Sequence, residues 1–599
     1  MERDCVCSDT IIAASFGLSL LIKNMGENFT EVLGWDEKQN GMVKAKQTNF
    51  MHKGVRKCVQ LTYNDGRKLI LTPNHRLLTS NNEWVTAENL KIGVDKIKCS
   101  VTYPVMDIKA EIEECKGWSL DVGTIKLTTT STSEYLKTLS FARMMGYLIT
   151  DGHLNDSSRG LIFLGHELDV ERFLDDLKKF QDIQQTNFVS KNLYCVRFSN
   201  IFTRNILKLK GFITGRKSTQ AALLPEFIID ENCPRPIVRE FLAGLFGGDG
   251  HTCVLGMHRG KRDMLTSPGF SQTKSHEHLE SLNAMMEQIQ ILFKKCGIHK
   301  TTIQKPKETS HSKVKYAGKD NTEKHFEINL HLDISELIPF SEKIGFRYCC
   351  HKSQRLEAGV AYRRLREETI RQRSWLINCI DKITDYSKIK RETPNKIVHT
   401  KKATQQAIDE LKKIEPIVHK YVIPTGTNVS DALRYKSTME KFRYKNFPTA
   451  AVFMKEVGAF AWFNDGEDNC YGVCRGSKCL PTMELTLIDR RDAGEHDVYD
   501  IEVEKVNSFS ANGLVSHNCM ISHGAARFTK DRIYHASDTY QVYTCEKCGM
   551  VATFNDEKKI HLCKYCNNST HFKFNQIPYA CKLLFQELIT MNIAPRIIS

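Results

Sequence analysis

Short runs of alternating apolar and polar residues occur near both ends of the chain. Residues 59–63 and 68–72 alternate around Asn64-Asp65-Gly66, which is a strong signal for a tight hairpin turn. Residues 483–488 and 498–503 have the same strand character. We therefore expect residues 5–100 and 481–518 to form one β-rich domain from two separate pieces of the chain.

Between these pieces an apolar motif with small residues occurs twice, as MMGYLITDG at 144–152 and LAGLFGGDG at 242–250. Each copy ends in Asp-Gly and is followed by a β stretch, a helix and another β stretch. The helices cover residues 169–180 and 277–293, and the later β stretches cover 193–198 and 325–332. A Gly-Phe pair followed by Lys-Ser then recurs in equivalent places. Residues 141–356 therefore read as two copies of one α/β half.

Composition adds limits to this picture. A chain of 599 residues with 41% hydrophobic and 26% charged residues indicates a soluble protein of three or more domains. No stretch is apolar enough to cross a bilayer, and the opening Met-Glu-Arg-Asp is not a signal peptide. The 21 scattered cysteines indicate reduced thiols, metal ligands and nucleophiles, and the net charge of +15 favours a polyanionic partner.

Reactive side chains stand at both ends of the β-rich pieces. Cys5 lies near the start, and the last stretch ends in His517-Asn518-Cys519. An Asn side chain can attack its own backbone carbonyl, close a ring and cut the chain, while a Cys thiol can accept an acyl group and a His can move a proton. His-Asn-Cys alone is a weak signal, because a surface turn explains it too.

Four blocks strengthen the signal, namely residues 5–12 (CVCSDTII), 71–77 (LTPNHRL), 498–503 (VYDIEV) and 508–519 (SFSANGLVSHNC). In this order they resemble the splicing blocks of an intein, and the resemblance covers residues 5–518. It implies an all-β Hedgehog/intein (HINT) splicing domain whose termini lie together.

The resemblance also implies a role for each residue. Cys5 attacks the carbonyl of Asp4, with Thr72 and His75 assisting, and Cys519 takes over the acyl group while Asp500 tunes its proton transfer. Asn518 then cyclises with help from His517. Asn507 stands where many inteins carry a His, so it can orient water or backbone but cannot carry a proton. A Hedgehog-like autoprocessing domain is the nearest alternative, and Asn518-Cys519 argues against it.

The repeated motif is similar to that of LAGLIDADG homing endonucleases. This resemblance implies two pseudo-symmetric αββαββα halves whose motif helices pack side by side and bring Asp151 and Asp249 together. The two carboxylates would hold Mg²⁺ for cleavage of double-stranded DNA at the intein-free gene junction, with Lys217 and Lys352 flanking them. An inert insertion that retains only the fold is the alternative.

Residues 357–480 read as a basic helical extension and linker. Ala358, Ala361 and Leu365 follow helical spacing, with arginines on the other faces. A solvated helix face is the default interpretation, and extra DNA contact is the second. Cys470, Cys474 and Cys479 lack ligand spacing and are interpreted as structural.

In the tail, Cys545-x2-Cys548 and Cys563-x2-Cys566 have zinc-ribbon spacing, which predicts a Zn²⁺ site. Joining residues 1–4 to the tail gives MERDCMISHGA, which with residues 579–588 resembles the second-largest subunit of eukaryotic RNA polymerase II. The resemblance implies a small α+β clamp module that binds other polymerase subunits. The expected location is nuclear, or cytoplasmic if the chain is virus-encoded, and not secreted.

The expected segments are 1–4 (N-extein), 5–100 and 481–518 (splicing domain), 101–136 (linker), 137–356 (endonuclease), 357–480 (extension) and 519–599 (C-extein).

Overall fold

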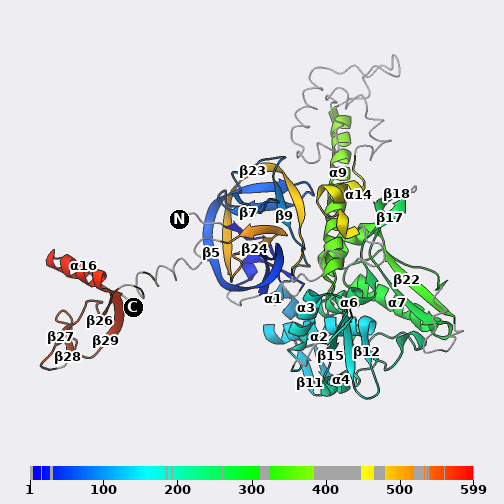
Figure 1. The fold of residues 1–599 in the computed structure, drawn as a ribbon, viewed down its shortest axis with the longest axis horizontal. Helices are drawn as coiled ribbons and strands as arrows, with labels where there is room; N and C mark the ends of the chain where they lie inside the picture. The colour runs from blue at the N-terminus through cyan, green and yellow to red at the C-terminus, as the bar shows by residue number, and fades with distance from the viewer. Residues whose placement is uncertain are drawn as a thin grey trace, which may run out of the picture. The chain divides into compact units, whose positions relative to one another are not determined.

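The computed structural model describes residues 5–14, 17–26, 31–182, 187–190, 193–258, 261–309, 324–383, 447–463, 479–518, 532, 536, 538–558 and 560–597. Two compact units, Met1–Asn518 and Cys519–Ser599, divide the chain (Figure 1). Among the described helices, none has both the length and the apolar content needed to span a bilayer.

The two β-rich pieces of the sequence share one twelve-stranded sheet, in which the short first strand is central. Strand β1 (Val6–Cys7) lies between β6 (Lys68–Leu71) and β23 (Met483–Val503), antiparallel to both. The last strand, β25 (Leu514–His517), pairs with β24 (Ser508–Ala511), β7 (Arg76–Leu78) and β9 (Lys96–Cys99). The other strands are β2 (Ile11–Ala13), β3 (Ser19–Leu21), β4 (Glu31–Asp36), β5 (Gly41–Tyr63) and β8 (Trp84–Thr86). Residues about 500 positions apart in sequence thus become neighbours.

Two strands that the hydrophobic pattern predicts separately form one continuous strand in the structure. Residues 483–488 and 498–503 belong to the single strand β23, whose pairing with β5 shifts register near Gly494. The polar residues 489–497 continue as strand because β5 supplies backbone partners along the whole length, which an alternation pattern cannot reveal.

The inserted part contains two halves with the predicted order of elements. The first comprises α2 (Thr132–Asp151), β12 (Gly152–Leu154), β13 (Gly160–Leu164), α3 (Glu167–Leu177), β14 (Asn187–Ser190), β15 (Leu193–Arg197) and α4 (Asn200–Ile206). The second comprises α6 (Arg235–Gly248), β16 (Gly250–His251), β19 (Gly269–Ser275), α7 (Leu279–Lys295), β20 (Thr301–Ile303), β22 (His325–Leu332) and α8 (Leu337–Lys343). The second half also carries the hairpin β17 (Leu255–His258) and β18 (Lys261–Leu265), and a short strand, β21 (Lys307–Glu308).

Local sequence fixes where the two motif helices begin. Ser131 caps α2 by accepting the backbone N–H of Glu134, and α6 starts at a proline pair, which suits the first helical turn. The helices then cross in backbone contact, because a Cβ on Gly146 would lie 2.0 Å from the carbonyl oxygen of Phe241 and one on Gly244 2.0 Å from that of Arg143. Glycine is therefore required at both crossing points.

Buried charged side chains also join the two halves. Glu240 of α6 accepts hydrogen bonds from Arg347 (2.9 Å), Arg239 (3.1 Å) and Arg143 of α2 (3.1 Å). Burial alone would raise the pKa of Glu240, but these guanidinium groups hold that pKa at about 2. The carboxylate thus stays ionised and ties three segments of the interface together.

Helix α9 (Cys350–Ile383) starts before the boundary that the sequence suggested at residue 356. Ala358, Ala361 and Leu365 are buried, and Arg363 pairs with Glu367 at 2.7 Å. At the start of the extension the apolar face is thus buried, and the Arg363 side chain, which is 15% exposed, is held in an ion pair. The basic runs 396–402 and 435–445, and Cys470 and Cys474, lie outside the described residues.

The second unit is small. It contains β26 (Thr539–Cys545), β27 (Thr553–Asn555), β28 (Ile560–Leu562), β29 (Phe572–Pro578) and α16 (Tyr579–Thr590). Two antiparallel pairs, β26 with β29 and β27 with β28, make up its sheets.

Candidate functional site

Cys5 is buried at the start of β1, between two chain segments. Its N–H donates to Thr72 Oγ1 at 3.1 Å, and its carbonyl accepts the N–H of Thr72 at 3.0 Å. The pairing of Val6 with Tyr499 and of Cys7 with Val498 places the buried Asp500 opposite Cys5. The structure therefore brings Cys5, Thr72 and Asp500 together, as the sequence blocks predict.

His75 is buried beside the same peptide. Burial, then the neighbouring His517 and Arg76, lower its pKa to about 3, although contact with the Cys5 backbone acts in the other direction. Within the described part of the chain, neither ring nitrogen has a hydrogen-bond partner. His75 is thus a neutral imidazole at physiological pH.

His517 and Asn518 form the other side of the site. Both are buried, and His517 Nδ1 lies 2.5 Å from the carbonyl oxygen of Asn518. The N–H of Asn518 donates to the carbonyl of Asn507 at 3.1 Å. Asn507, which has a φ of 48°, therefore contacts the Asn518 peptide through its backbone carbonyl. Cys519 and Asp4 lie outside the described residues.

Arg76 is a member of this site that the sequence analysis missed. Its Nη2 lies 3.0 Å from His517 Nδ1, and the edge of Trp84 packs on the His517 ring at a centroid distance of 4.8 Å. An arginine side chain can only donate hydrogen bonds. His517 Nδ1 therefore accepts from Arg76 when this nitrogen is unprotonated, and it donates to the Asn518 carbonyl when it carries a proton. Its position directly after His75 was the available signal.

A second site lies where α2 and α6 end. Asp151 Oδ2 would be 3.0 Å from a Cβ on Gly248, the residue before Asp249, so the two aspartates lie close together. Burial, then the charge of Asp249, raise the pKa of Asp151 to about 6, and burial also raises that of Asp249. Two desolvated carboxylates of like charge are suited to a divalent cation.

The flanking lysines also bind the ends of the two motif helices. Lys217 Nζ donates to the carbonyls of Leu148 (2.7 Å), Ile149 (2.8 Å) and Thr150 (3.1 Å) at the end of α2. Lys352 Nζ does the same to the end of α6, with Gly247 O at 2.7 Å. Both lysines therefore cap helix C-termini beside the aspartates. Their N–H groups bind backbone carbonyls, and their positive charges act on the two carboxylates.

The sequence analysis also missed two polar residues from β19. Gln272 Nε2 donates to Asp249 Oδ2 at 3.1 Å, and Lys274 lines the same pocket as Asp249 and Lys217. Burial lowers the pKa of Lys274 to about 8, with the charge of Asp249 acting in the other direction. No motif marks either residue, because only strand pairing places β19 beside the motif helices.

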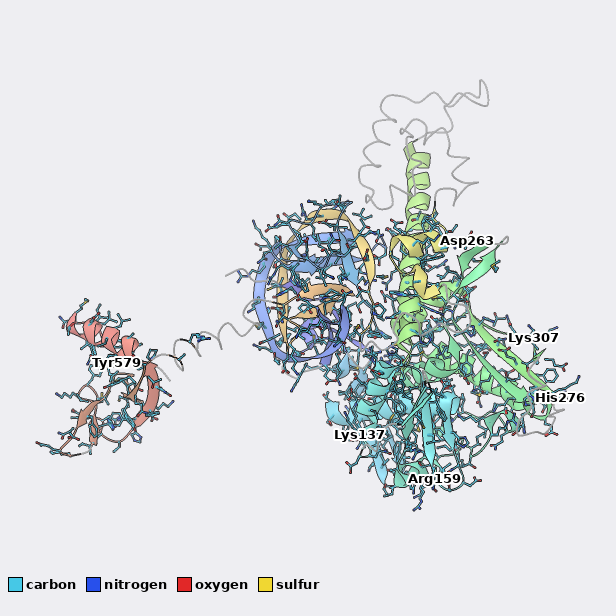
Figure 2. All side chains as sticks on the ribbon, in the orientation of Figure 1. Lys137, Arg159, Asp263, His276, Lys307 and Tyr579 are labelled. Carbon is cyan, nitrogen blue, oxygen red and sulfur yellow. The ribbon has the colours of Figure 1, made fainter. Side chains whose placement is uncertain are left out.

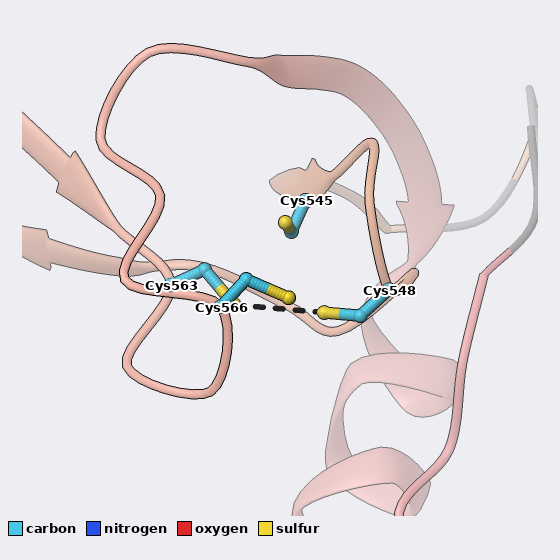
Figure 3. Close-up of side chains that lie close together, drawn as sticks. All are labelled: Cys545, Cys548, Cys563 and Cys566. Carbon is cyan, nitrogen blue, oxygen red and sulfur yellow. Dashed lines mark hydrogen bonds between the residues drawn. The ribbon is translucent and has the colours of Figure 1, made fainter.

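Two clusters have metal-ligand chemistry. The sulfur atoms of Cys545, Cys548, Cys563 and Cys566 all lie within 4.8 Å of one another (Figure 3). A tetrahedral zinc–thiolate centre requires sulfur atoms about 3.8 Å apart, so the four side chains fit Zn²⁺. In the second cluster, His166 Nδ1 accepts the Leu168 N–H that begins α3, and Asp169 accepts the Cys350 N–H that begins α9. Those side chains serve as helix caps.

The described site thus gathers thiol, imidazole and amide side chains from residues 5, 75, 517 and 518 in one buried region. Residues 11–518 match the family described as "Intein splicing domain", so the chain belongs to this family. Residues 513–599 match "RNA polymerase Rpb2, domain 7". The chain therefore carries an intein splicing domain, which implies autocatalytic protein splicing, fused to a C-terminal region of an RNA polymerase second subunit.

Individual relatives agree with the tail assignment. DNA-directed RNA polymerase II subunit 2 of Arabidopsis thaliana is 49% identical over 87 residues, or 14% of this chain and 7% of that protein. Subunit RPB2 of Encephalitozoon cuniculi is 49% identical over 85 residues, with the same coverage. The chain thus spans about 7% of the length of these curated relatives.

Among solved structures, the Ssp DnaB mini-intein variant M86 is 24% identical, with 17% of this chain and 67% of that chain covered, and has a TM-score of 0.16. A DnaB intein from Synechocystis is also 24% identical, with coverage of 16% and 70% and a TM-score of 0.16. At such TM-scores these likenesses add nothing to the fold.

Proposed function

We propose that Cys5, Asn518 and Cys519 carry the splicing reaction. Cys5 attacks the carbonyl of Asp4, Cys519 takes over the acyl group, and Asn518 cyclises to release residues 5–518. The Asp4 acyl group then moves from the Cys519 sulfur to the freed Cys519 amine, and this S-to-N shift leaves an Asp4–Cys519 peptide bond. The observation that supports this assignment is the common site of Cys5, Thr72, His75, His517 and Asn518.

Mass spectrometry of the purified chain tests this proposal. We expect a released segment of residues 5–518 and a ligated product that joins residues 1–4 to 519–599. An unchanged full-length chain would contradict it. Because Asn518→Ala removes the ring-closing amide, this variant should retain residues 519–599 on the intein.

Arg76 should set the pH at which Asn518 is cleaved. Its guanidinium disfavours a proton on His517 Nδ1, so we expect Arg76→Met to move the pH profile of C-terminal cleavage to higher pH. The profile is measured by release of residues 519–599 from the Cys5→Ala chain. Arg490→Met is the matched control, since Arg490 donates to the Ala87 carbonyl at 2.9 Å instead. Equal shifts in both variants would refute the assignment.

We further propose that the inserted halves form a LAGLIDADG-type endonuclease that cleaves double-stranded DNA at the intein-free gene junction. The paired Asp151 and Asp249, desolvated at the crossing of α2 and α6, support it. They would hold Mg²⁺, which would activate water and stabilise the leaving oxygen. Lys217 and Lys352 position the helix ends, and exposed basic side chains such as Arg159 and Lys307 offer phosphate contacts (Figure 2). Failure to cut junction DNA with Mg²⁺ would favour an inert insertion.

For the tail we propose a zinc-stabilised clamp module that joins other RNA polymerase II subunits after ligation. We expect one Zn²⁺ per unspliced Asn518→Ala chain, lost in Cys545→Ser and kept in Cys581→Ser, whose cysteine lies outside the four-thiol cluster. Without the metal, residues 538–597 should become protease-sensitive, because so small a unit buries little apolar surface. Metal analysis and limited proteolysis provide the two measurements. Full protease resistance in Cys545→Ser would contradict this expectation.

A further inference from the structure

Arg67 is a buried cation at a junction of three chain segments. Its Nε donates to Asp65 Oδ2 (3.1 Å) in the β5–β6 turn, and its Nη1 donates to the Asn512 carbonyl (2.6 Å) in the β24–β25 turn. Its Nη2 donates to Glu357 Oε1 at 2.5 Å. Glu357 comes from α9, which continues from the inserted domain, so the insertion supplies one carboxylate to the interior of the splicing domain.

Both carboxylate oxygens of Glu357 accept hydrogen bonds at this junction. Its Oε2 accepts the N–H of Thr102 at 2.9 Å and the Thr102 hydroxyl at 2.5 Å, while Oε1 accepts from Arg67. The side chains of Arg67 and Glu357 are only 4% and 2% exposed, so water cannot replace a lost partner.

The turn that Arg67 holds belongs to the terminal hairpin. Asn512 is fixed on its other sides too, because its Oδ1 accepts the Ile11 N–H at 2.7 Å and its Nδ2 donates to the Lys68 carbonyl at 3.0 Å. A Cβ on Gly513 would lie 2.0 Å from Arg67 Nη1, so the guanidinium packs directly on the turn. Strand β25 runs from this turn to His517 and Asn518, and the clamp at the turn therefore sets the position of the reacting end.

We propose that Glu357 of the inserted segment is a positioning residue for cleavage at Asn518, acting through Arg67 and the terminal hairpin. The insertion is then a working part of the splicing domain, in addition to any activity on DNA. This inference rests on the proposed role of Asn518.

The Glu357→Gln variant tests it with an isosteric change. Both Glu357 oxygens accept hydrogen bonds, and a glutamine offers one oxygen, so its amide N–H₂ must face either Arg67 or the Thr102 donors. In the Cys5→Ala chain, we expect release of residues 519–599 to slow about tenfold, with partial recovery in Glu357→Asp. Asp175→Asn is the matched control, because Asp175 of α3 pairs with Lys44 of β5 at 2.5 Å, also between insertion and sheet but away from the hairpin.

A second readout separates positioning from general damage. In the Asn518→Ala chain with a carrier protein fused to its N-terminus, thiol-induced cleavage at Cys5 should keep its rate in Glu357→Gln within about twofold, as for uncoupled sites. Equal loss at both ends would reduce Glu357 to a purely structural role and overturn the inference. Should Glu357→Gln fail to fold, Thr102→Val removes only one hydroxyl donor and should slow Asn518 cleavage about fivefold, by about the value of one hydrogen bond.

Different outcomes would contradict the role of Glu357 and the proposed role of Asn518. Normal Asn518 cleavage in Glu357→Gln, Glu357→Asp and Thr102→Val overturns the role of Glu357 alone. Absence of Asn518 cleavage in the parent chain overturns the proposed function and this inference together.

Discussion

Replacing His75 with alanine should slow thioester formation at Cys5 by about a hundredfold or more, the usual contribution of a placed acid or base. The ring lies beside the Cys5 backbone, and its two nitrogens are buried with no partner among the described residues. Such groups need an explanation, and the scissile Asp4–Cys5 peptide is the group on which we propose that this site acts. Thiol-induced cleavage of an N-terminal carrier from the Asn518→Ala chain measures the effect.

The pH dependence of that step should also identify the form of His75. With a pKa of about 3, His75 is neutral from pH 5 to 9, so its contribution should not titrate there. Because the folded-state pKa lies below the unfolded value, the stability gained by a neutral His75 is present above about pH 6.5 and is lost as pH falls towards 3. A cleavage step with a histidine midpoint near 6.5 that disappears in His75→Ala would contradict the neutral assignment.

The second large effect is expected at the acidic pair. Asp151→Asn should reduce cleavage of junction DNA at least about a hundredfold, because the loss of one carboxylate removes several kcal/mol of metal-assisted stabilisation. Supercoiled plasmid carrying the intein-free junction, incubated with Mg²⁺, gives the rate. Asp156→Asn is the control, since Asp156 is an exposed aspartate of the β12–β13 turn. Full activity in Asp151→Asn would rule out the proposed metal role.

The same substitution should make the metal-free protein more stable. Burial and Asp249 raise the pKa of Asp151 to about 6 from 3.8, which corresponds to at most about 3 kcal/mol of destabilisation at pH 7. The sign follows from linkage, because a raised carboxyl pKa lowers stability as pH rises from about 4 to 6 and leaves the penalty in place above that. Thermal unfolding without metal should therefore show a higher midpoint for Asp151→Asn, and the difference should vanish below pH 4. Loss of both activity and stability would indicate misfolding instead.

Several features could be read from the residues because they depend on local order. The Asn64-Asp65-Gly66 turn forms the predicted hairpin, the repeated Asp-Gly motifs lie at the ends of α2 and α6, and the four spaced cysteines bring their sulfur atoms within 4.8 Å of one another. The family of residues 11–518 also follows from short blocks, since the chemistry of peptide cleavage needs particular side chains next to particular peptide bonds.

The features that no sequence pattern predicted share one cause. The continuity of β23, the start of α9 and the capping roles of Lys217 and Lys352 all depend on partners far away in the chain. Gln272, Lys274 and Arg76 carry no motif of their own, so only their neighbours reveal them.

By itself, the sequence determined which chemical groups are available: a cysteine at one end, His-Asn-Cys at the other, two aspartates that each follow a glycine-containing apolar motif, and four cysteines in two Cys-x2-Cys pairs. Only the tertiary structure decided which of them share an environment. Sheet pairing between residues near 5, 72 and 500 sets Cys5 beside its helpers, and the buried Arg67–Glu357 pair joins the insertion to the terminal hairpin. The reason is physical, because burial and proximity change pKa values and hydrogen-bond partners, and neither quantity is a property of a residue's place along the chain.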